Sequence, residues 1–315
     1  MSTKIKIAVC LLSFNHEKTI SSVVDSILKQ DGAKYKFYVS DDSSTDGSWG
    51  ILQAFKNQGH EITLLKTPYN YGMAGNANYA FQFIDEPYVA LLHHDDICAP
   101  DLLAEWASVL DLNPSVGFVF NQYGVYGSDF VYRENFASEV INGNKFIEDN
   151  LFSSWGCIVR GTAMIRKSFW DQAGGMQPKY GLLADIDLWM RLSMISDVGY
   201  VAKPLIYVQH SRPDDYPEEY CSEVWSWKRL KFLYDIHADN FKKYWRYKTF
   251  FGKLRWVGFR LRLNLETMKW LLYAFIRSRR DMLITCQDSK TQYDFLILRM
   301  TRELLVLYCS FRWGR

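Results

Sequence analysis

Two histidines and two aspartates, His93 to Asp96, directly follow an apolar run at residues 88–92. Neighbouring carboxylates repel each other, so Asp95 and Asp96 are most easily explained if a cation or a cationic transition state lies between them. Mg²⁺ and Mn²⁺ favour oxygen ligands, and one or two protein carboxylates suffice when other oxygens complete the coordination shell. The four residues therefore indicate either a metal site or a site of developing positive charge.

Two other polar clusters end apolar runs in the same way. The run that begins at Ile5 ends in residues 13–17 (SFNHE), and the run that begins at Tyr35 ends in residues 40–46 (SDDSSTD). Short apolar runs rich in β-formers are typical of buried parallel strands. Ligands of parallel sheets gather beyond the carboxyl ends of the strands, so we expect the three clusters to meet in one crevice.

The elements that must position these clusters alternate between strand and helix patterns. We expect strands near residues 5–14, 35–40, 61–68 and 88–93, and helices near residues 17–30, 49–55 and 69–84. This alternation predicts an α/β fold with a mostly parallel sheet flanked by helices. Beyond residue 110 the alternation weakens, and we expect a strand pair around Gly124 in 116–127, a strand and helix in 156–175, a helix in 182–195 and a strand in 199–211.

The charge is divided unevenly along the 315 residues. Residues 228–315 carry 20 Lys and Arg against 7 Asp and Glu, about +13, whereas residues 1–227 carry 17 against 28, about −11. Such asymmetry indicates two parts. We therefore predict an α/β domain at residues 1–227 and a basic, aromatic-rich helical region at residues 228–315.

Cysteine usage and hydropathy indicate the compartment. The six cysteines are widely scattered and form no C-x-x-C pair, which is typical of reduced thiols rather than of a disulfide framework. Residues 1–6 are too short and too polar for a signal peptide, and no stretch approaches 18 consecutive apolar residues. We expect a cytoplasmic protein without a spanning helix.

The ordered set of motifs resembles the family 2 glycosyltransferases with a GT-A fold, of the bacterial surface-polysaccharide type. The motifs are, in order, Ser13-Phe14-Asn15, the loop Asp41–Asp46, Asn70-Tyr71-Gly72, the acid pair Asp95-Asp96, the turn Gly174-Gly175, and Asp185 leading into a helix with Trp189 and Arg191. The similarity spans roughly residues 5–212. It implies an inverting transferase whose donor is a nucleoside diphosphate sugar.

The resemblance implies donor-binding roles for seven residues: Ser13, Asn15, Asp41, Asp42, Asn70, Gly72 and Asp95. Asp42, with Asp41 beside it, can accept hydrogen bonds from the base imide or the ribose, because a carboxylate is purely an acceptor. The alternative is that the loop at residues 41–46 is a surface turn capping the next helix, since Ser, Thr and Asp are favoured there.

The implied cofactor is Mn²⁺ or Mg²⁺ bridging the donor phosphates. Asp96 is the first choice of ligand, while Asp95 contacts the ribose or sugar or supports the metal. The family motif carries a carboxylate where this chain has His93, and an imidazole can bind Mn²⁺ but suits Mg²⁺ poorly. Alternatively, His93 and His94 hydrogen-bond to nearby backbone. His210 lies where some relatives supply a late metal ligand or phosphate contact, and an ordinary surface histidine is the alternative.

The acceptor hydroxyl needs a base, and Asp185 matches the family's base position for a single displacement with inversion. Ala184 replaces the acidic residue usual before it, and the loss of this like charge should weaken the upward push on the pKa of Asp185. Asp187 is the rival base, and helix capping by Asp185 is the structural alternative. Trp155 and Gly156 lie where such enzymes often build the acceptor floor, although a core tryptophan explains the indole equally well.

The basic region at residues 228–315 mixes Lys and Arg with Trp, Tyr, Phe and Leu. As helices, such segments present apolar faces bordered by cations and bind an anionic membrane surface. A homo-oligomer contact is the alternative, and the two are compatible. Nucleic acid is disfavoured, because no recognised binding motif accompanies the charge.

Two functions follow from these patterns. The first is a metal-dependent inverting glycosyltransferase, peripheral on the inner face of the cell membrane, that passes a sugar to a lipid-linked glycan acceptor. The second is a catalytically silent nucleotide-sugar-binding or scaffold protein, motivated by the missing carboxylates at His93 and Ala184. A dehydrogenase is disfavoured because no G-x-G-x-x-G follows the first strand.

Overall fold

The computed structural model describes residues 5–152, 157–208 and 223–245, together with isolated positions between 250 and 265. Trp155, Gly156 and His210 lie outside the described residues. The chain divides into two compact units, residues 1–215 and residues 216–315. The second unit contains the helix α9 (Glu223–Tyr244), through which the predicted boundary at 227/228 runs. The assignment of residues 228–315 to a membrane surface or a second subunit stays a prediction.

The first unit is built on one mixed, mostly parallel sheet with the strand order β3-β2-β1-β4-β9-β6-β10-β5. Its strands are β1 (Ile7–Ser13), β2 (Tyr35–Asp41), β3 (Ile62–Lys66), β4 (Tyr88–His93), β5 (Asp96–Cys98), β6 (Val116–Val125), β9 (Ala163–Arg166) and β10 (Asp197–Val208). The first four are parallel, β9 runs antiparallel to both β4 and β6, and β10 runs parallel to β6. The short strands β7 (Val131–Tyr132) and β8 (Val140–Ile141) pair with β6 and β10. The predicted fold class is confirmed.

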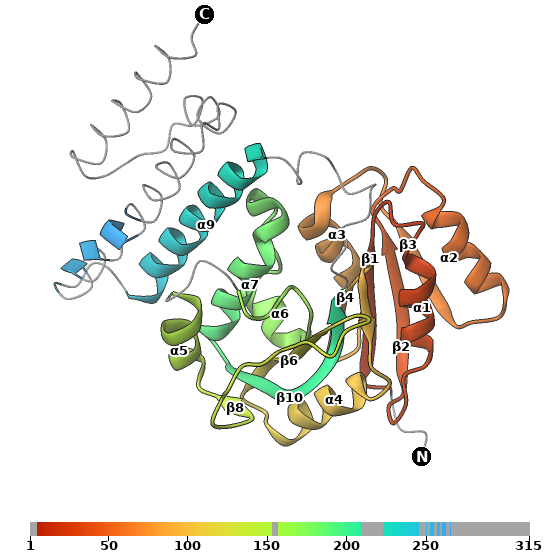
Figure 1. Cartoon of the computed structure of the whole chain (residues 1–315), viewed down its shortest axis with the longest axis horizontal. Helices are drawn as coiled ribbons and strands as arrows, with labels where there is room; N and C mark the ends of the chain where they lie inside the picture. The colour runs from red at the N-terminus through yellow and green to blue at the C-terminus, as the bar shows by residue number, and fades with distance from the viewer. Residues whose placement is uncertain are drawn as a thin grey trace, which may run out of the picture. The chain divides into compact units, whose positions relative to one another are not determined.

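Helices cover both faces of this sheet, with α1 and α2 on one face and α3, α6 and α7 on the other (Figure 1). The helices are α1 (Ile20–Leu28), α2 (Ser48–Asn57), α3 (Gly72–Phe81), α4 (Leu102–Leu112), α5 (Gly143–Phe146), α6 (Lys167–Ala173) and α7 (Ala184–Ser193), with a π-helical turn at Ile147–Leu151 and a 3₁₀ segment at Pro178–Leu183. In α1 the apolar residues at helical spacing are the buried ones: Ile20, Val23, Val24 and Ile27. Right-handed crossovers place α1 and α2 together, because β1, β2 and β3 proceed in one direction across the sheet.

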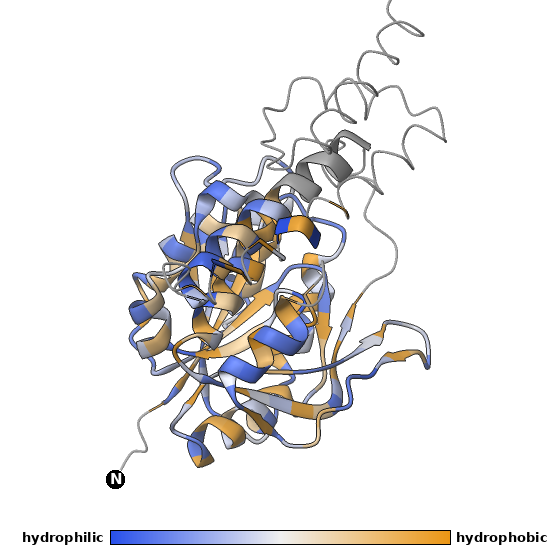
Figure 2. Cartoon of the chain, turned by 90° about the vertical axis from the view of Figure 1, so that its left-hand side faces the viewer, coloured by the Kyte–Doolittle hydropathy of each residue, from blue (hydrophilic) through white to orange (hydrophobic). Residues whose placement is uncertain are grey.

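Apolar residues concentrate along the strands (Figure 2), and every residue of β1 is buried. Strands buried on both faces read as continuous apolar runs, which is why the sequence pattern locates them. No helix in the part of the chain that the structure describes is long and apolar enough to span a bilayer.

One expected element is wrong. The sequence predicts a strand pair around Gly124, but β6 runs without a break from Val116 to Val125. Gly124 is needed for packing rather than for a turn, since a Cβ there would lie 2.5 Å from Cδ1 of Tyr207 on β10. The partner strand β7 follows after the turn at residues 126–130.

Candidate functional site

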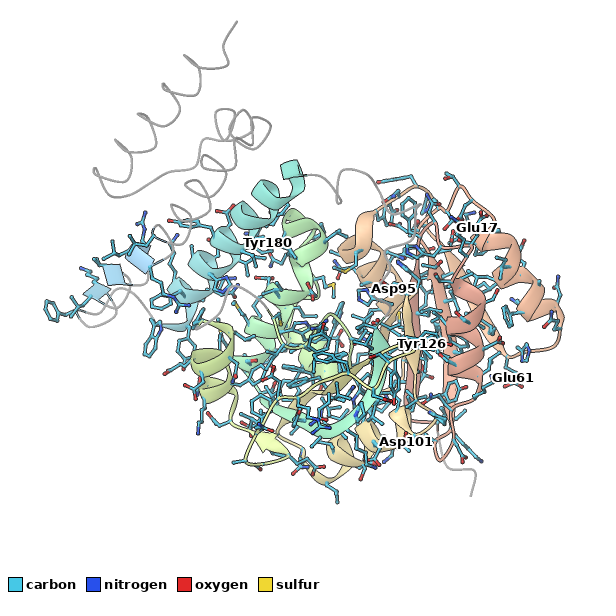
Figure 3. The ribbon with its side chains drawn as sticks, in the orientation of Figure 1. Glu17, Glu61, Asp95, Asp101, Tyr126 and Tyr180 are labelled. Carbon is cyan, nitrogen blue, oxygen red and sulfur yellow. The ribbon has the colours of Figure 1, made fainter. Side chains whose placement is uncertain are left out.

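The three polar clusters lie at one edge of the sheet. Ser13 at the end of β1 is in register with Asp41 at the end of β2, and Leu12 is in register with His93 at the end of β4. In Figure 3, Asp95 and Glu17 lie toward this edge, and Asp101 lies toward the opposite one. The predicted convergence of the three clusters on the carboxyl edge is therefore confirmed.

The Asp41-Asp42 pair is buried at the end of β2. Oδ1 of Asp42 accepts hydrogen bonds from Oγ1 of Thr67 (2.9 Å) and from the backbone N–H of Tyr71 (2.8 Å), and burial raises the pKa of Asp42. Oδ1 of Asp41 accepts from the N–H of Ser44 (3.0 Å), while its Oδ2 is buried without a hydrogen-bond partner among the described residues. This unsatisfied oxygen indicates a ligand or water contact, because a buried acceptor without a partner is unfavourable.

Asn15 ties the loops after β1 and β2 together. Its side-chain Oδ1 accepts from the N–H of Thr45 (2.8 Å), and its own N–H donates to Oγ of Ser44 (3.0 Å). Asn15 and Ser43 both have positive φ, 52° and 60°. Non-glycine residues in the left-handed region cluster at ligand sites, where the surroundings fix them.

The helix-capping alternative holds for part of this loop. Asp46 accepts from the backbone N–H of Ser48, in the first turn of α2, at 3.0 Å, and from the N–H of Glu17, also at 3.0 Å. Asp41 and Asp42 lie deeper. The loop therefore combines a capping carboxylate with two buried ones.

The remaining predicted donor residues line the same edge. Oδ1 of Asn70 accepts from the N–H of Gly72 (2.8 Å), whose φ of 72° opens α3 in a conformation that favours glycine. Ser13 is buried, and its hydroxyl has no partner among the described residues. A buried hydroxyl without a partner is unfavourable, as is the Oδ2 atom of Asp41.

The acid pair has two different environments. Asp95 is half-buried, whereas Asp96 is buried where β5 pairs with Val208 of β10. Burial, with the charge of Asp95, raises the pKa of Asp96 well above its usual value. Burial acts on Asp95 as well, but the protonated forms of the neighbouring imidazoles, His94 first and then His93, outweigh it and lower the pKa of Asp95. Asp95 is the more accessible and the more readily ionised of the two.

A pair of histidine rings in close contact, His16 and His94, acts on Asp95 of the acid pair. The rings of His16 and His94 lie 3.4 Å apart between centroids, with Nδ1 of His94 bonded to the carbonyl of Leu12 at 3.2 Å and Nδ1 of His16 to that of Phe14 at 2.7 Å. Burial lowers the pKa of His94 to about 3, so this ring is neutral at pH 7. The backbone-bonding interpretation of His94 is confirmed. His16 was not predicted as a site residue, although it stands in one of the three polar clusters.

His93 and Asp185 meet around Gly161. A Cβ at Gly161 would lie 3.2 Å from Nε2 of His93 and 3.5 Å from Oδ2 of Asp185, so both polar atoms border the same point. Nε2 of His93 is buried and lacks a hydrogen-bond partner among the residues described. Burial raises the pKa of Asp185, and the nearby His93 opposes that rise. A carboxylate whose pKa is raised is a stronger base than an exposed one, which suits the predicted role of Asp185.

Asp187, the rival base, forms a buried ion pair that stabilises the fold. It is fully buried and accepts from Nε of Arg191 at 2.8 Å, while the other guanidinium nitrogens donate to the carbonyls of Ala173 (2.6 Å) and Gly175 (2.7 Å). The pair thus holds the glycine turn against α7. Arg191 is therefore a salt-bridge residue of the fold.

The donor set fits a divalent cation that is shared with a phosphorylated ligand. No cluster of three or more His, Cys, Asp or Glu in the described chain is arranged to hold a metal by itself. Asp95, Asp96 and the unpartnered Nε2 of His93 nevertheless stand together, and one or two carboxylates suffice when phosphates and water complete the shell.

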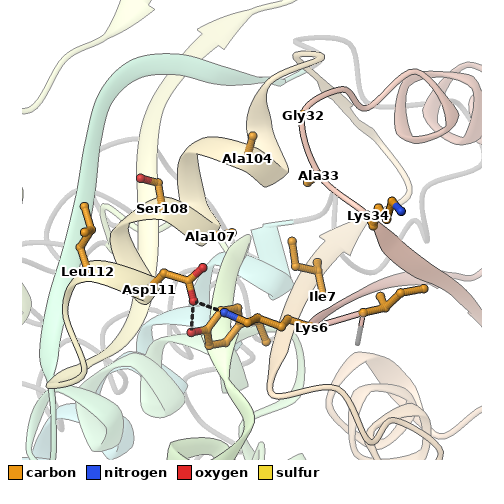
Figure 4. Close-up of a pocket in the computed structure, with 12 residues that line it drawn as sticks. Lys6, Ile7, Gly32, Ala33, Lys34, Ala104, Ala107, Ser108, Asp111 and Leu112 are labelled. Carbon is orange, nitrogen blue, oxygen red and sulfur yellow. Dashed lines mark hydrogen bonds and ion pairs between the residues drawn. The ribbon is translucent and has the colours of Figure 1, made fainter. Parts of the chain in front are cut away.

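A cavity of about 560 Å³ lies at the opposite, amino edge of the sheet (Figure 4). Its polar groups bond to one another, since Asp111 accepts from Nζ of Lys6 (2.9 Å) and from the hydroxyl of Tyr88 (2.7 Å). Buried polar atoms without a partner, such as those of Ser13, Asp41 and His93 at the carboxyl edge, have no counterpart among the described residues that line this cavity. The carboxyl edge is therefore the better candidate site.

Comparison with known proteins points the same way. The sequence model described as glycosyl transferase family 2 matches residues 8–173. A segment of 143 residues is 28% identical to the UDP-Glc:alpha-D-GlcNAc-diphosphoundecaprenol beta-1,3-glucosyltransferase WfgD of Escherichia coli, covering 45% of this chain and 55% of that protein. The putative glycosyltransferase EpsE of Bacillus subtilis is 24% identical over 247 residues, covering 76% of this chain and 81% of that protein.

Two solved structures share the fold. The structure of S. aureus TarS 1–349 with UDP-GlcNAc superposes with a TM-score of 0.68 at 17% identity, covering 99% of this chain and 93% of that one. The mannosyltransferase PcManGT from Pyrobaculum calidifontis, in complex with GDP-Man and Mn²⁺, gives a TM-score of 0.56 at 16% identity, covering 100% and 89%. At these identities the likeness shows the fold alone.

Proposed function

The chain belongs to glycosyl transferase family 2, and from this premise we propose that it transfers a sugar, with inversion, from a nucleoside diphosphate sugar to a hydroxyl of a lipid-linked glycan in cell-surface polysaccharide synthesis. The observation that carries the proposal is the meeting of Asp185 and His93 around Gly161, at the edge that also holds Asp42 and Asp95. This arrangement supports a base, a cation site and nucleotide-binding residues at one edge of the sheet.

The proposed donor pocket is formed by residues at or near the ends of β1 and β2 and at the start of α3. Asp41 and Asp42 would accept hydrogen bonds from the base imide or the ribose, and Ser13, Asn15, Asn70 and Gly72 would complete the pocket. The buried Oδ2 of Asp41 and hydroxyl of Ser13, both without partners among the described residues, support this role. TarS was solved with UDP-GlcNAc and PcManGT with GDP-Man, which supports a nucleoside diphosphate sugar as donor.

The chemical step is a single displacement. The acceptor oxygen attacks the anomeric carbon while Asp185 removes its proton, and the bond from that carbon to the diphosphate oxygen breaks. Mn²⁺ or Mg²⁺ held by Asp95, Asp96 and His93 would offset the negative charge of the departing diphosphate. Mn²⁺ is the better match to an imidazole ligand.

The proposal of a lipid-linked acceptor is supported by the names of related proteins and by the charge of the basic region. WfgD is named for a diphosphoundecaprenol-linked acceptor, which is a lipid-linked sugar. The net charge of about +13 in residues 228–315 would hold the enzyme at an anionic membrane surface, each cation contributing on the order of 1 kcal/mol. Trp155 and Gly156 remain the proposed acceptor floor, and His210 a proposed late metal or phosphate contact.

The test is a donor screen followed by turnover. Calorimetry with UDP-, GDP- and dTDP-sugars in the presence of Mn²⁺ identifies the donor, and release of nucleoside diphosphate is then measured with lipid-linked acceptors. Asp185→Asn should bind the donor and lose transfer by a factor of about 10² to 10⁴. Asp101→Asn, at the opposite edge, is the matched control and should keep full activity.

The outcomes separate the two functions. Donor binding without release of nucleoside diphosphate under any acceptor condition would support the silent binding protein instead. Full transfer by Asp185→Asn would remove the proposed base. Failure to bind any nucleoside diphosphate sugar would refute both.

A further inference from the structure

A strained turn before β9 contains Arg160, which directly precedes Gly161. Arg160 has φ 41° and is followed by Gly161 with φ 80°, so two consecutive residues lie in the left-handed region. Glycine adopts this conformation readily, but arginine does not. The surroundings therefore fix Arg160 in this position, as they do for strained residues at ligand sites.

Two tyrosine rings hold the side chain of Arg160 in place. The guanidinium carbon lies 3.9 Å from the ring centroid of Tyr132 and 5.7 Å from that of Tyr123. The hydroxyl of Tyr123 donates to the carbonyl of Val159 (2.7 Å), which ties the same turn to β6. A guanidinium stacked on a ring keeps its in-plane N–H groups free to donate.

The charge of Arg160 is exposed and has no carboxylate within 4 Å in the part of the chain that the structure describes. It does act on the buried Asp96, whose pKa it lowers against the larger effect of burial. Among the residues that the structure describes, no hydrogen bond or ion pair occupies the N–H groups of this guanidinium, and its charge acts on Asp96. A planar fork of N–H groups matches the oxygens of a phosphate.

The sheet order separates Arg160 from the donor pocket. The proposed nucleotide residues end β1 and β2, on one side of β4, whereas Arg160 precedes β9 and stacks on β7, on the other side. The neighbouring Gly161 touches the space between His93 and Asp185, where the acceptor hydroxyl must lose its proton. The charge therefore lies away from the proposed nucleotide residues, and it acts on Asp96.

We propose that Arg160, held on Tyr132, binds a phosphate group of the acceptor and so makes the enzyme specific for phosphate-bearing acceptors. This inference rests on the proposed function, because it takes Asp185 as the base. It names the chemical class of the acceptor: a sugar hydroxyl carried close to a phosphate, either in a lipid-linked diphosphate or in a phosphodiester polymer.

The experiment measures acceptor binding with the donor pocket filled. The protein is saturated with Mn²⁺ and whichever of UDP, GDP and dTDP binds most tightly, and it is then titrated with an N-acetylglucosaminyl diphosphate bearing a short alkyl chain. The matched alkyl N-acetylglucosaminide lacks phosphate, and a short polyol phosphodiester oligomer forms the third arm. Comparison of the first and third arms identifies the source of the phosphate.

Arg160→Ala should weaken binding of a phosphate-bearing probe by about ten- to a hundredfold and leave both the phosphate-free probe and the nucleotide unchanged. Arg160→Lys should recover part of the loss, because it keeps the charge without the planar fork. Arg133→Ala is the matched control: it removes the same charge from an exposed site beside Tyr132 and should leave all affinities unchanged.

Three results would overturn the proposal. They are wild-type protein that binds neither phosphate-bearing probe, equal losses for Arg160→Ala and Arg133→Ala, and a loss of nucleotide affinity in Arg160→Ala. The last result would assign Arg160 to the donor. Because nucleotide binding is measured separately, its absence in wild-type protein would count against the proposed function itself.

Discussion

Replacing Gly161 by alanine tests whether the meeting of His93 and Asp185 matters for the reaction. The new methyl group would lie 3.2 Å from Nε2 and 3.3 Å from Cε1 of His93, and 3.5 Å from Oδ2 of Asp185. The first two separations are tighter than most contacts of a real Cβ, so the imidazole must move by a few tenths of an ångström. The substitution therefore displaces site residues without removing any of them.

Two effects of this change can be separated by a matched control. The φ of 80° at Gly161 costs alanine about 1–2 kcal/mol of stability through the backbone alone. Gly59 has a φ of 94° with nothing within 4 Å of its would-be Cβ, and it lies in the loop before β3, away from the crevice. Gly59→Ala should thus show the backbone cost without the displacement.

The expected result is a similar loss of stability but a different loss of rate. Misplacement of reacting groups by 1 Å can cost about a hundredfold in rate, so a shift of a few tenths should lower kcat roughly tenfold in Gly161→Ala and leave it unchanged in Gly59→Ala. Urea unfolding followed by circular dichroism gives the stabilities, and release of nucleoside diphosphate at saturating substrates gives kcat. Equal kcat values in the two variants would refute the claim that the positions of His93 and Asp185 around Gly161 matter for the reaction.

Three further predictions concern single side chains. Asp187→Asn leaves the Arg191 guanidinium buried without its carboxylate and should lower the free energy of unfolding by about 3–5 kcal/mol, measured by urea denaturation; a loss below 1 kcal/mol would contradict the structural role. Activity should fall as pH drops through the raised pKa of Asp185, and His93→Gln should move this acid limb to higher pH, because His93 lowers that pKa; a pH–rate profile showing no movement would count against the contact. Asp42→Asn keeps an oxygen for the contacts within the fold but loses charge, so calorimetry should show nucleotide affinity falling about tenfold with little change in Tm; unchanged affinity would remove Asp42 from the donor pocket.

The sequence was sufficient to predict which polar clusters meet at the carboxyl edge, but it was not sufficient to predict the strand pairing in the half of the sheet beyond β4. β1, β2 and β4 are local, continuous apolar runs, and parallel pairing alone brings their polar ends together. The insertion of antiparallel β9 between β4 and β6 is a non-local pairing, and periodicity carries no signal for it. The same limit explains the misplaced turn at Gly124, where the Tyr207 ring on a distant strand sets the requirement for glycine.

Several features of the site depend on contacts between residues that are distant in the sequence, and the sequence pattern does not predict such contacts. The ring contact between His16 and His94 joins residues 78 positions apart, and the cation–π contact of Arg160 depends on a hairpin that the sequence pattern did not reveal. Asp187 and Arg191 are the exception. Their i,i+4 spacing on one helix is a local signal, and it predicts the ion pair that the structure contains.

The two departures from the family pattern act on Asp185 in the same direction. An acidic residue at position 184 and a carboxylate at position 93 would each place a negative charge near a base that burial already makes harder to ionise. This chain has Ala184 and His93 instead, and the imidazole lowers the pKa of Asp185. The two substitutions, which in sequence favour loss of activity, are therefore in the folded protein compatible with a working base.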